Sequence, residues 1–137
     1  MNIIHATHEA VQKFGGIGSV LEGLLSASAY QKAVRRSILV GPLSDPGDVT
    51  TLRREGEVIF SSFDAKGESR VSKALRNVEI EHNVNLVYGK RQFGDGIEAE
   101  VLLVDAAHVN PRKVLNFKHN LYQHFELSSE RFFMPMK

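Results

Sequence analysis

The stretch that decides the fold is Lys13-Phe14-Gly15-Gly16-Ile17-Gly18, which follows an apolar segment at residues 3–6 and runs into an amphipathic pattern. A strand, a glycine turn and a helix in this order bring backbone N–H groups and the positive end of a helix to one point, which suits a phosphate. Lys13 adds a full positive charge, and Gly15 and Gly16 permit close backbone approach and positive φ. The dinucleotide and Walker A patterns are both incomplete. A glycine turn before a helix is also common as a purely structural connection that binds no ligand.

Composition predicts one soluble, cytoplasmic domain. The chain has 137 residues, of which 42% are hydrophobic and 24% charged, and its net charge is +1. That balance gives no reason to expect nucleic acid as a partner. There is no cysteine, which excludes disulfides and thiolate chemistry. The apolar runs fall short of the roughly 18 residues that a membrane span needs, and the N-terminus lacks the features of a signal peptide.

The hydrophobic pattern predicts a strand–helix–strand start and a hairpin near the middle of the chain. Strands are expected at residues 3–6, 37–40, 58–60, 78–88 and 99–104, and helices at 17–31, at 69–77 and from 128 onward. The strands at 78–88 and 99–104 form the hairpin. Residues 43–57 are expected to be a loop with one helical turn, and residues 105–125 to be irregular with some helical turns.

This order of elements is typical of an open α/β sheet. We predict a Rossmann-like, mostly parallel sheet with helices on both faces. The first strand should lie centrally, because its apolar run does not alternate and so indicates burial on both sides. The chain stops just as another helix begins. Residues 1–137 are therefore expected to be a single truncated N-terminal domain, or else a fold smaller than its opening suggests.

Other polar groups give weaker signals. The histidines (His5, His8, His82, His108, His119 and His124) lack the spacing of a zinc helix, so no metal site is expected. His8 and Glu9 follow the first strand, on the side where ligands bind in open α/β sheets. A polar-aromatic cluster within residues 116–125 (Asn116, Lys118, His119, Asn120, Tyr122, His124 and Phe125) could stack on sugars or bases, but such clusters are mostly half-buried loop packing.

Three segments carry a resemblance to a known family. They are Met1-Asn2-Ile3-Ile4-His5-Ala6-Thr7-His8-Glu9, Lys13-Phe14-Gly15-Gly16-Ile17-Gly18-Ser19-Val20 and Leu127-Ser128-Ser129-Glu130-Arg131-Phe132. Together they resemble the N-terminal region of the glycogen and starch synthases. In that family a Ser-Glu pair ends the first strand, a Lys-x-Gly-Gly-Leu-[Gly/Ala]-Asp-Val motif opens the helix, and Asn-Ala-Glu-Arg-Phe begins a later one. Residues 84–89 and 101–105 look like two successive family strands, whereas residues 43–77 match poorly.

The resemblance implies a GT-B glycosyltransferase that moves glucose from ADP-glucose or UDP-glucose to an α-glucan, without a metal. It implies two Rossmann-like domains with the cleft between them, and the C-terminal domain would hold the catalytic groups. By position, Lys13, Gly15 and Gly16 would bind the nucleotide-sugar phosphates, and His8, Glu9 and Ser19 would lie on the acceptor side. His8 replaces the usual Ser, and Ser19 the usual Asp. The alternative is a non-catalytic α/β module that binds a small anion or a protein partner.

Overall fold

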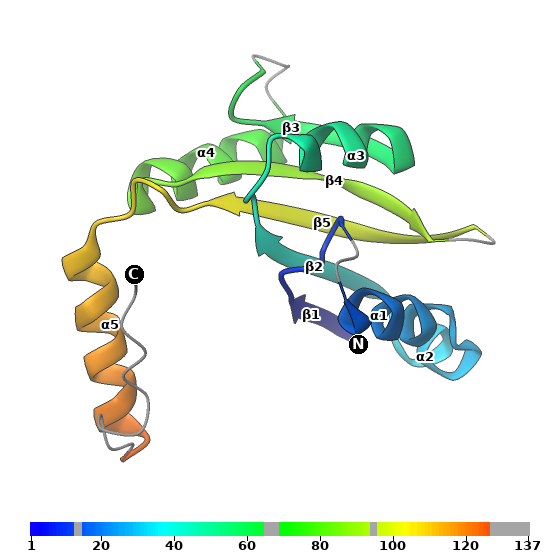
Figure 1. The fold of residues 1–137 in the computed structure, drawn as a ribbon, viewed down its shortest axis with the longest axis horizontal. Coiled ribbons are helices and arrows are strands. Elements are labelled where there is room, and N and C mark those ends of the chain that lie inside the picture. The colour runs from blue at the N-terminus through cyan, green and yellow to red at the C-terminus, as the bar shows by residue number, and fades with distance from the viewer. Residues whose placement is uncertain (13–14, 65–68, 94–95, 127–137) are drawn as a thin grey trace.

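The computed structural model describes residues 1–12, 15–64, 69–93 and 96–126. These residues form five strands and five helices (Figure 1). In chain order they are β1 (Asn2–Ala6), α1 (Gly16–Ser26), α2 (Ser28–Ala33), β2 (Arg36–Pro42), α3 (Gly47–Glu55), β3 (Gly56–Ser61), α4 (Arg70–His82), β4 (Asn85–Phe93), β5 (Ile97–Asp105) and α5 (Pro111–His124). The chain is an α/β protein, as the sequence predicted. Within the described ranges, no helix is long and apolar enough to cross a membrane.

The sheet is mixed, so the expectation of a mostly parallel sheet needs correction. Its strand order is β1-β2-β5-β4-β3. The β1–β2 and β2–β5 pairings are parallel, and the β5–β4 and β4–β3 pairings are antiparallel. The β4–β5 hairpin predicted from the sequence is confirmed, and it is one reason for the mixture. A connection this short can join only antiparallel strands, because a parallel pair needs a crossover of a dozen residues or more.

The prediction of a central first strand is wrong. Strand β1 pairs with β2 alone and forms one edge of the described sheet. Its side chains alternate between partly buried and exposed, and Ile4 is 67% exposed. The run at residues 3–6 was expected to be buried on both sides, but within the described residues only the face that carries Ile3 and His5 is partly covered. The continuous apolar run therefore does not reflect burial on two faces here.

Helices cover both faces of the sheet, as predicted. A Cβ built on Gly89 of β4 would lie 3.2 Å from Leu52 of α3, so α3 covers the Gly89 face. The neighbouring Tyr88 points to the opposite face and pairs with Phe60 of β3. The guanidinium of Arg76 on α4 lies 5.3 Å from the Phe60 ring centroid, so α4 covers this second face. The main core lies on the Gly89 face and includes Leu21, Leu25, Leu39, Leu52, Val87, Val101 and Leu103.

Several element boundaries differ from the sequence prediction. The helix expected at 17–31 is broken at Ala27 into α1 and α2. Helix α4 extends to His82, so the start of the segment expected as a strand at 78–88 is helical. Residues 47–55 form the complete helix α3 in place of a loop. The helix expected from residue 128 lies outside the described residues.

Helix α5 occupies much of the segment that was expected to be irregular. Asn110 caps it, since the Asn110 side chain accepts a hydrogen bond from the Arg112 amide at 2.9 Å, and Pro111 takes the first turn. None of its residues is buried, and in Figure 1 it extends away from the sheet. The polar-aromatic cluster at 116–125 is therefore mainly a helix surface.

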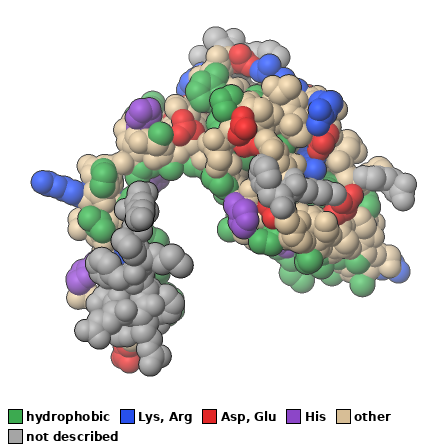
Figure 2. Space-filling view, in the orientation of Figure 1, with side chains coloured by type: hydrophobic (Ala, Val, Ile, Leu, Met, Phe, Trp, Pro, Cys, Tyr) green, Lys and Arg blue, Asp and Glu red, His purple; other side chains and the backbone are tan. Residues whose placement is uncertain are grey.

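Large apolar side chains also reach solvent on α1. Leu21 and Leu25 are buried, as the helical stripe predicted, whereas Ile17, Val20 and Leu24 are exposed. Figure 2 shows hydrophobic side chains along the lower border of the molecule, over the region of α1 and α2. The described residues therefore cover only part of the apolar stripe of α1.

Candidate functional site

The polar loops gather at one edge of the sheet. Strands β1, β2 and β5 run parallel, and β3 runs in the same direction because it pairs antiparallel with β4, so all four end at this edge. We call it the carboxyl edge. Three adjoining hollows lie along it, the first beside Thr7 and His8, the second beside Gln12 and Asp48, and the third beside Phe63. Ligands of open α/β sheets bind at such an edge.

Glu9 is the best-defined candidate residue at this edge. Its side chain is 3% exposed, and its Oε2 accepts a hydrogen bond of 2.7 Å from the backbone N–H of Gly18 in the first turn of α1. The carboxyl group therefore lies against the amino end of a helix, where a negative charge is favoured. Its other oxygen, Oε1, would be 3.2 Å from a Cβ at Gly15. Glu9 thus fixes the start of α1 against the end of β1.

The glycine turn stays open on its outer side. Gly15 and Gly16 are both exposed, and a Cβ on Gly16 would meet nothing within 4 Å. Gly15 has an extended backbone with φ −154°, so the positive φ considered for this position does not occur. Lys13, the residue proposed to reach the phosphates, lies outside the described residues. The space beside the Gly16 Cα is open to a ligand, whereas Glu9 already occupies the Gly18 amide.

His8 and Ser19, the residues next in sequence to Glu9 and Gly18, are exposed. His8 Nε2 is 3.8 Å from Glu9 Oε1, and the His8 side chain is mostly open to solvent. Ser19 is an exposed residue of α1. The Glu9 backbone N–H donates to Thr7 Oγ1 at 3.1 Å, which shapes the turn that holds this group together. Of the two consecutive residues His8 and Glu9, the structure buries Glu9 and leaves His8 exposed.

A buried arginine that the sequence reasoning missed supports this turn. Arg91 is on β4, and its Nη1 donates to the carbonyl oxygen of Ala10 at 3.2 Å while its Nε donates to Glu55 Oε2 at 2.9 Å. Its guanidinium also lies 4.6 Å from the ring centroid of Phe93. The segment after Glu9 is thereby tied to the sheet and to α3. The available signal was the alternation of β4, which places Arg91 on the core face together with Phe93.

A second tie joins the same segment to α3. The Gln12 side-chain amide donates to Asp48 Oδ1, and Asp48 is buried. Asp45 fixes the turn that precedes α3, since its side chain accepts from the Gly47 amide at 2.7 Å and its carbonyl oxygen from the Asp48 amide at 2.9 Å. These contacts connect the loops after β1 and β2, so the carboxyl edge is held by side chains from both.

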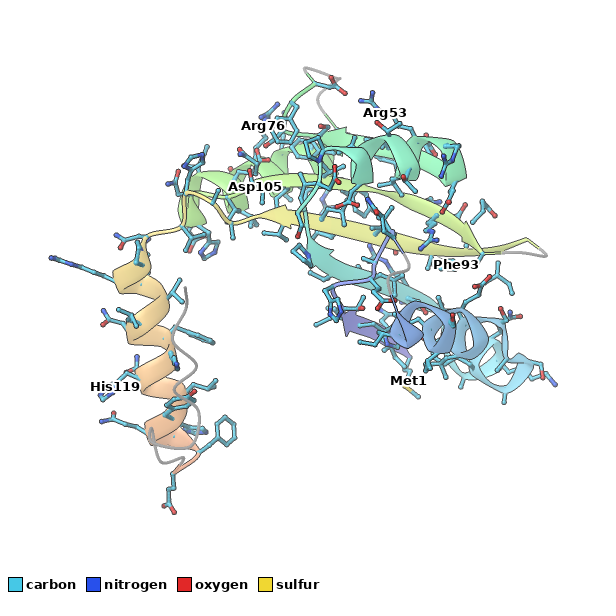
Figure 3. All side chains as sticks on the ribbon, in the orientation of Figure 1. Met1, Arg53, Arg76, Phe93, Asp105 and His119 are labelled. Carbon is cyan, nitrogen blue, oxygen red and sulfur yellow. The ribbon has the colours of Figure 1, made fainter. Side chains whose placement is uncertain are left out.

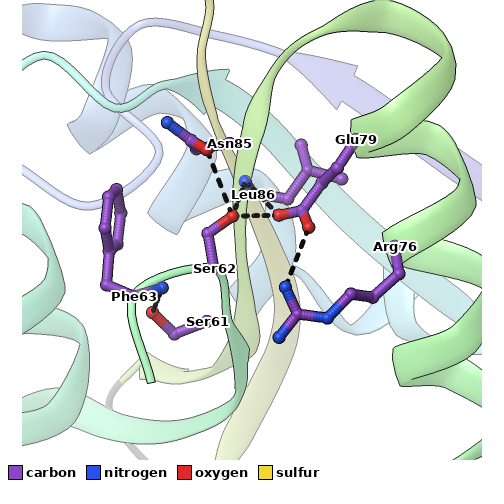
Figure 4. A network of polar contacts seen from close by, with 7 residues as sticks. All are labelled: Ser61, Ser62, Phe63, Arg76, Glu79, Asn85 and Leu86. Atoms are coloured by element: carbon purple, nitrogen blue, oxygen red, sulfur yellow. Dashed lines mark hydrogen bonds and ion pairs between the residues drawn. The ribbon is translucent and has the colours of Figure 1, made fainter. Parts of the chain in front are cut away.

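A polar network continues along the edge from α4 toward β5 (Figure 4). Glu79 accepts from the Leu86 amide at 2.9 Å and from the Ser62 hydroxyl, and Arg76 lies 3.5 Å from its other oxygen. Beyond this group, Asn85 donates from its Nδ2 to Asp105 Oδ2 at 3.1 Å. The network ties Ser62, just after β3, and Glu79 on α4 to the start of β4 at the end of the sheet.

Asp105 at the end of β5 is held as a carboxylate. Its Oδ1 accepts from the Ala107 amide at 3.0 Å. This backbone hydrogen bond, followed by the one from Asn85, lowers the pKa of Asp105 below its usual value. Figure 3 labels Asp105 at the end of β5 and Arg53 on α3. Asp105 is a functional candidate that the sequence interpretation did not select.

No protein-family model matches this chain, and no curated protein is significantly similar to it. Among the residues that the structure describes, no three His, Cys, Asp or Glu side chains form a group that could hold a metal ion. The class that the fold and the edge define is therefore an α/β protein with a mixed five-stranded sheet and a polar, hollowed carboxyl edge.

Proposed function

We propose that this chain is the acceptor-side lobe of a glycosyltransferase of the glycogen and starch synthase type. Such an enzyme moves glucose from ADP-glucose or UDP-glucose to an α-glucan. The observation that carries the proposal is the meeting of His8 and Glu9 with the open turn of Gly15 and Gly16 at the carboxyl ends of parallel strands. These are the positions at which the resemblance puts the acceptor and phosphate contacts.

In this proposal the residues at the edge have different roles. Glu9 is buried against the Gly18 amide, so it positions α1 and leaves the exposed His8 and Ser19 to contact the acceptor. The phosphates of the nucleotide sugar would approach the outer side of the turn, where Gly16 is open and Lys13 supplies the charge. Stabilising the departing diphosphate also needs an enclosed cleft, which a second lobe would close. The 137-residue chain alone should therefore show no measurable glucosyl transfer.

One observation favours the second candidate, a non-catalytic α/β module. The Glu9 carboxylate already uses the Gly18 amide and adds negative charge beneath the turn, which works against a phosphate. In that case the turn is structural, and the exposed carboxyl edge or α5 contacts a partner.

Titration of ADP-glucose and UDP-glucose into ¹⁵N-labelled chain separates the two candidates. The proposal expects the amides of Gly15 and Gly16 to shift, and Lys13→Ala to weaken binding. One charge-assisted contact of roughly 1.5–3 kcal/mol corresponds to about 10- to 150-fold. Gly16→Val should fold normally, since its side chain would enter open space, yet block the ligand. Lys32→Ala, a charge change on α2, is the matched control.

Shifts that survive Lys13→Ala unchanged would contradict the phosphate role of the lysine. The absence of any shift at Gly15 and Gly16 at saturating nucleotide sugar would favour the structural turn. The same variant in the two-lobe enzyme should lower kcat/KM by the same factor.

A further inference from the structure

The largest of the three hollows described on the carboxyl edge lies away from β1, beside the ends of β2, β3 and β5. It has a volume of about 560 Å³, within the roughly 300–1,000 Å³ of small-molecule sites. Part of its wall is apolar and part carries hydroxyl or charged groups. Its lining includes Leu43, Val49, Thr50, Arg53, Phe63, Asp64 and Asp105.

Phe63 presents an aromatic ring to this hollow instead of packing in the core. Its side chain is 61% exposed. The backbone that carries it is nonetheless fixed, because the Phe63 amide donates to Ser61 Oγ at 3.2 Å and the Ser62 amide donates to the Leu86 carbonyl oxygen at 2.9 Å. An exposed aromatic ring on a fixed backbone, next to a hollow, can pack against an apolar face of a ligand.

The charges of the hollow argue against an anionic ligand. Arg53 and Asp64 form an ion pair and so neutralise each other. Asp105 remains as a carboxylate, because its hydrogen bonds from Ala107 and Asn85 favour the charged form. Counted over the described residues, the lining therefore has a net negative charge. A phosphate or carboxylate would be repelled, whereas a neutral donor of hydrogen bonds would be attracted.

The hydrogen-bonding groups match a ligand with several hydroxyls. Each Asp105 oxygen uses one acceptor position within the chain and retains another. The Thr50 hydroxyl can both donate and accept. Leu43 and Val49 supply apolar wall next to these groups. A pyranose ring has hydroxyls along its edge and C–H groups on its faces, so it fits a carboxylate beside an aromatic ring.

We propose that this hollow binds a glucosyl unit, with Phe63 against the sugar face and Asp105 accepting from the sugar hydroxyls. The inference rests on the proposed function, because it makes the bound sugar a unit of the α-glucan acceptor. Continuity of the edge supports it. The hollow shares Ser44 with the small one beside Asp48, which in turn shares His8 and Pro42 with the one at β1. A glucan chain bound in this hollow would extend along the surface of the edge toward His8.

The test is calorimetric or NMR titration of maltotriose into the full chain. Phe63→Ala should weaken binding about 10-fold, as the loss of an aromatic contact does. Asp105→Asn should weaken it as well, with folding checked by thermal melting. The matched control is Ile80→Ala on α4, which removes an exposed apolar side chain, 81% exposed, away from the hollow and should leave binding unchanged.

Equal maltotriose affinity in wild type and folded Phe63→Ala would overturn the subsite, and so would a lack of maltotriose binding by the wild type. Displacement of maltotriose by adenosine would assign the ring to a base and also overturn it. Maltotriose binding that depends on Phe63, without nucleotide-sugar binding, would keep the subsite and refute the glycosyltransferase. Nucleotide-sugar binding that depends on Lys13, without a Phe63 effect, would do the reverse.

Discussion

Replacing Glu9 by Ala should destabilise the fold, because Glu9 holds the start of α1. The carboxylate accepts a 2.7 Å hydrogen bond from the Gly18 amide, and both residues are buried. A hydrogen bond to a charged group contributes roughly 1.5–3 kcal/mol, and its loss leaves a buried N–H without a partner. We expect the free energy of unfolding to fall by about 2–3 kcal/mol, which corresponds to a Tm lower by roughly 6–12 °C.

Glu9→Gln separates the charge from the hydrogen bond. The glutamine side chain keeps an acceptor oxygen but loses the charge that favours the amino end of a helix, an effect of about 0.3–1 kcal/mol and up to about 2 kcal/mol when partly buried. This variant should therefore lose about 1 kcal/mol. The matched control is Glu81→Gln on α4, whose side chain is 73% exposed and which should change stability by less than about 0.5 kcal/mol.

Urea unfolding followed by circular dichroism measures all three variants, and hydrogen exchange reports on the Gly18 amide itself. We expect unchanged m-values and faster exchange of the Gly18 amide in Glu9→Ala. The reasoning is refuted if Glu9→Ala is as stable as Glu81→Gln and the Gly18 amide exchanges at the wild-type rate.

Three further perturbations follow from the packing and the charges. Gly41→Ala should lower the stability of the fold by about 1–3 kcal/mol or more in thermal melts, since its Cβ would lie 2.4 Å from the Thr7 carbonyl oxygen. A variant as stable as the wild type would contradict this close approach of Thr7 to β2. Leu52→Ala, at a fully buried position of the core, should lose about 2–5 kcal/mol in urea unfolding, and a loss under 1 kcal/mol would contradict that burial. The hydrogen bond from Arg36 lowers the pKa of Glu100 below its usual 4.5, so Glu100 stabilises the fold above that pH and the contribution disappears as the pH falls through the folded pKa. Glu100→Gln should therefore flatten the acid limb of a stability–pH curve, and an unchanged limb would contradict the pairing.

The sequence predicted the elements whose signals are local. The strand at the N-terminus, the glycine turn into α1 and the β4–β5 hairpin follow from apolar runs and turn residues, and all are present. Helix α3 was missed because Val49 and Leu52 are the only large apolar residues in its span, which leaves a weak helical pattern. Helix α5 was missed although Asn110 and Pro111 form a start signal.

The placement of strands and of site residues depends on contacts between distant segments. An apolar run indicates that a strand can be buried. Whether the strand lies at the centre of the sheet or, like β1, at an edge of the described sheet depends on how the chain connects the strands. The spacing of Glu9 and Gly18 likewise does not reveal that the carboxyl group turns back under the helix. Phe63 follows β3 and Asp105 ends β5, so only the folded chain brings them to one hollow.

The most direct test of the central claim is a map of amide chemical-shift changes on the ¹⁵N-labelled chain with a nucleotide sugar and maltotriose added in turn. The account predicts two footprints on the carboxyl edge, the nucleotide sugar at Gly15 and Gly16 and maltotriose between His8 and Phe63. A polar hollow beside Arg36 and Glu100, at the opposite end of the sheet, is an alternative binding site. Amide shift changes that cluster around that hollow would contradict the account. So would the absence of shift changes on the carboxyl edge with either ligand.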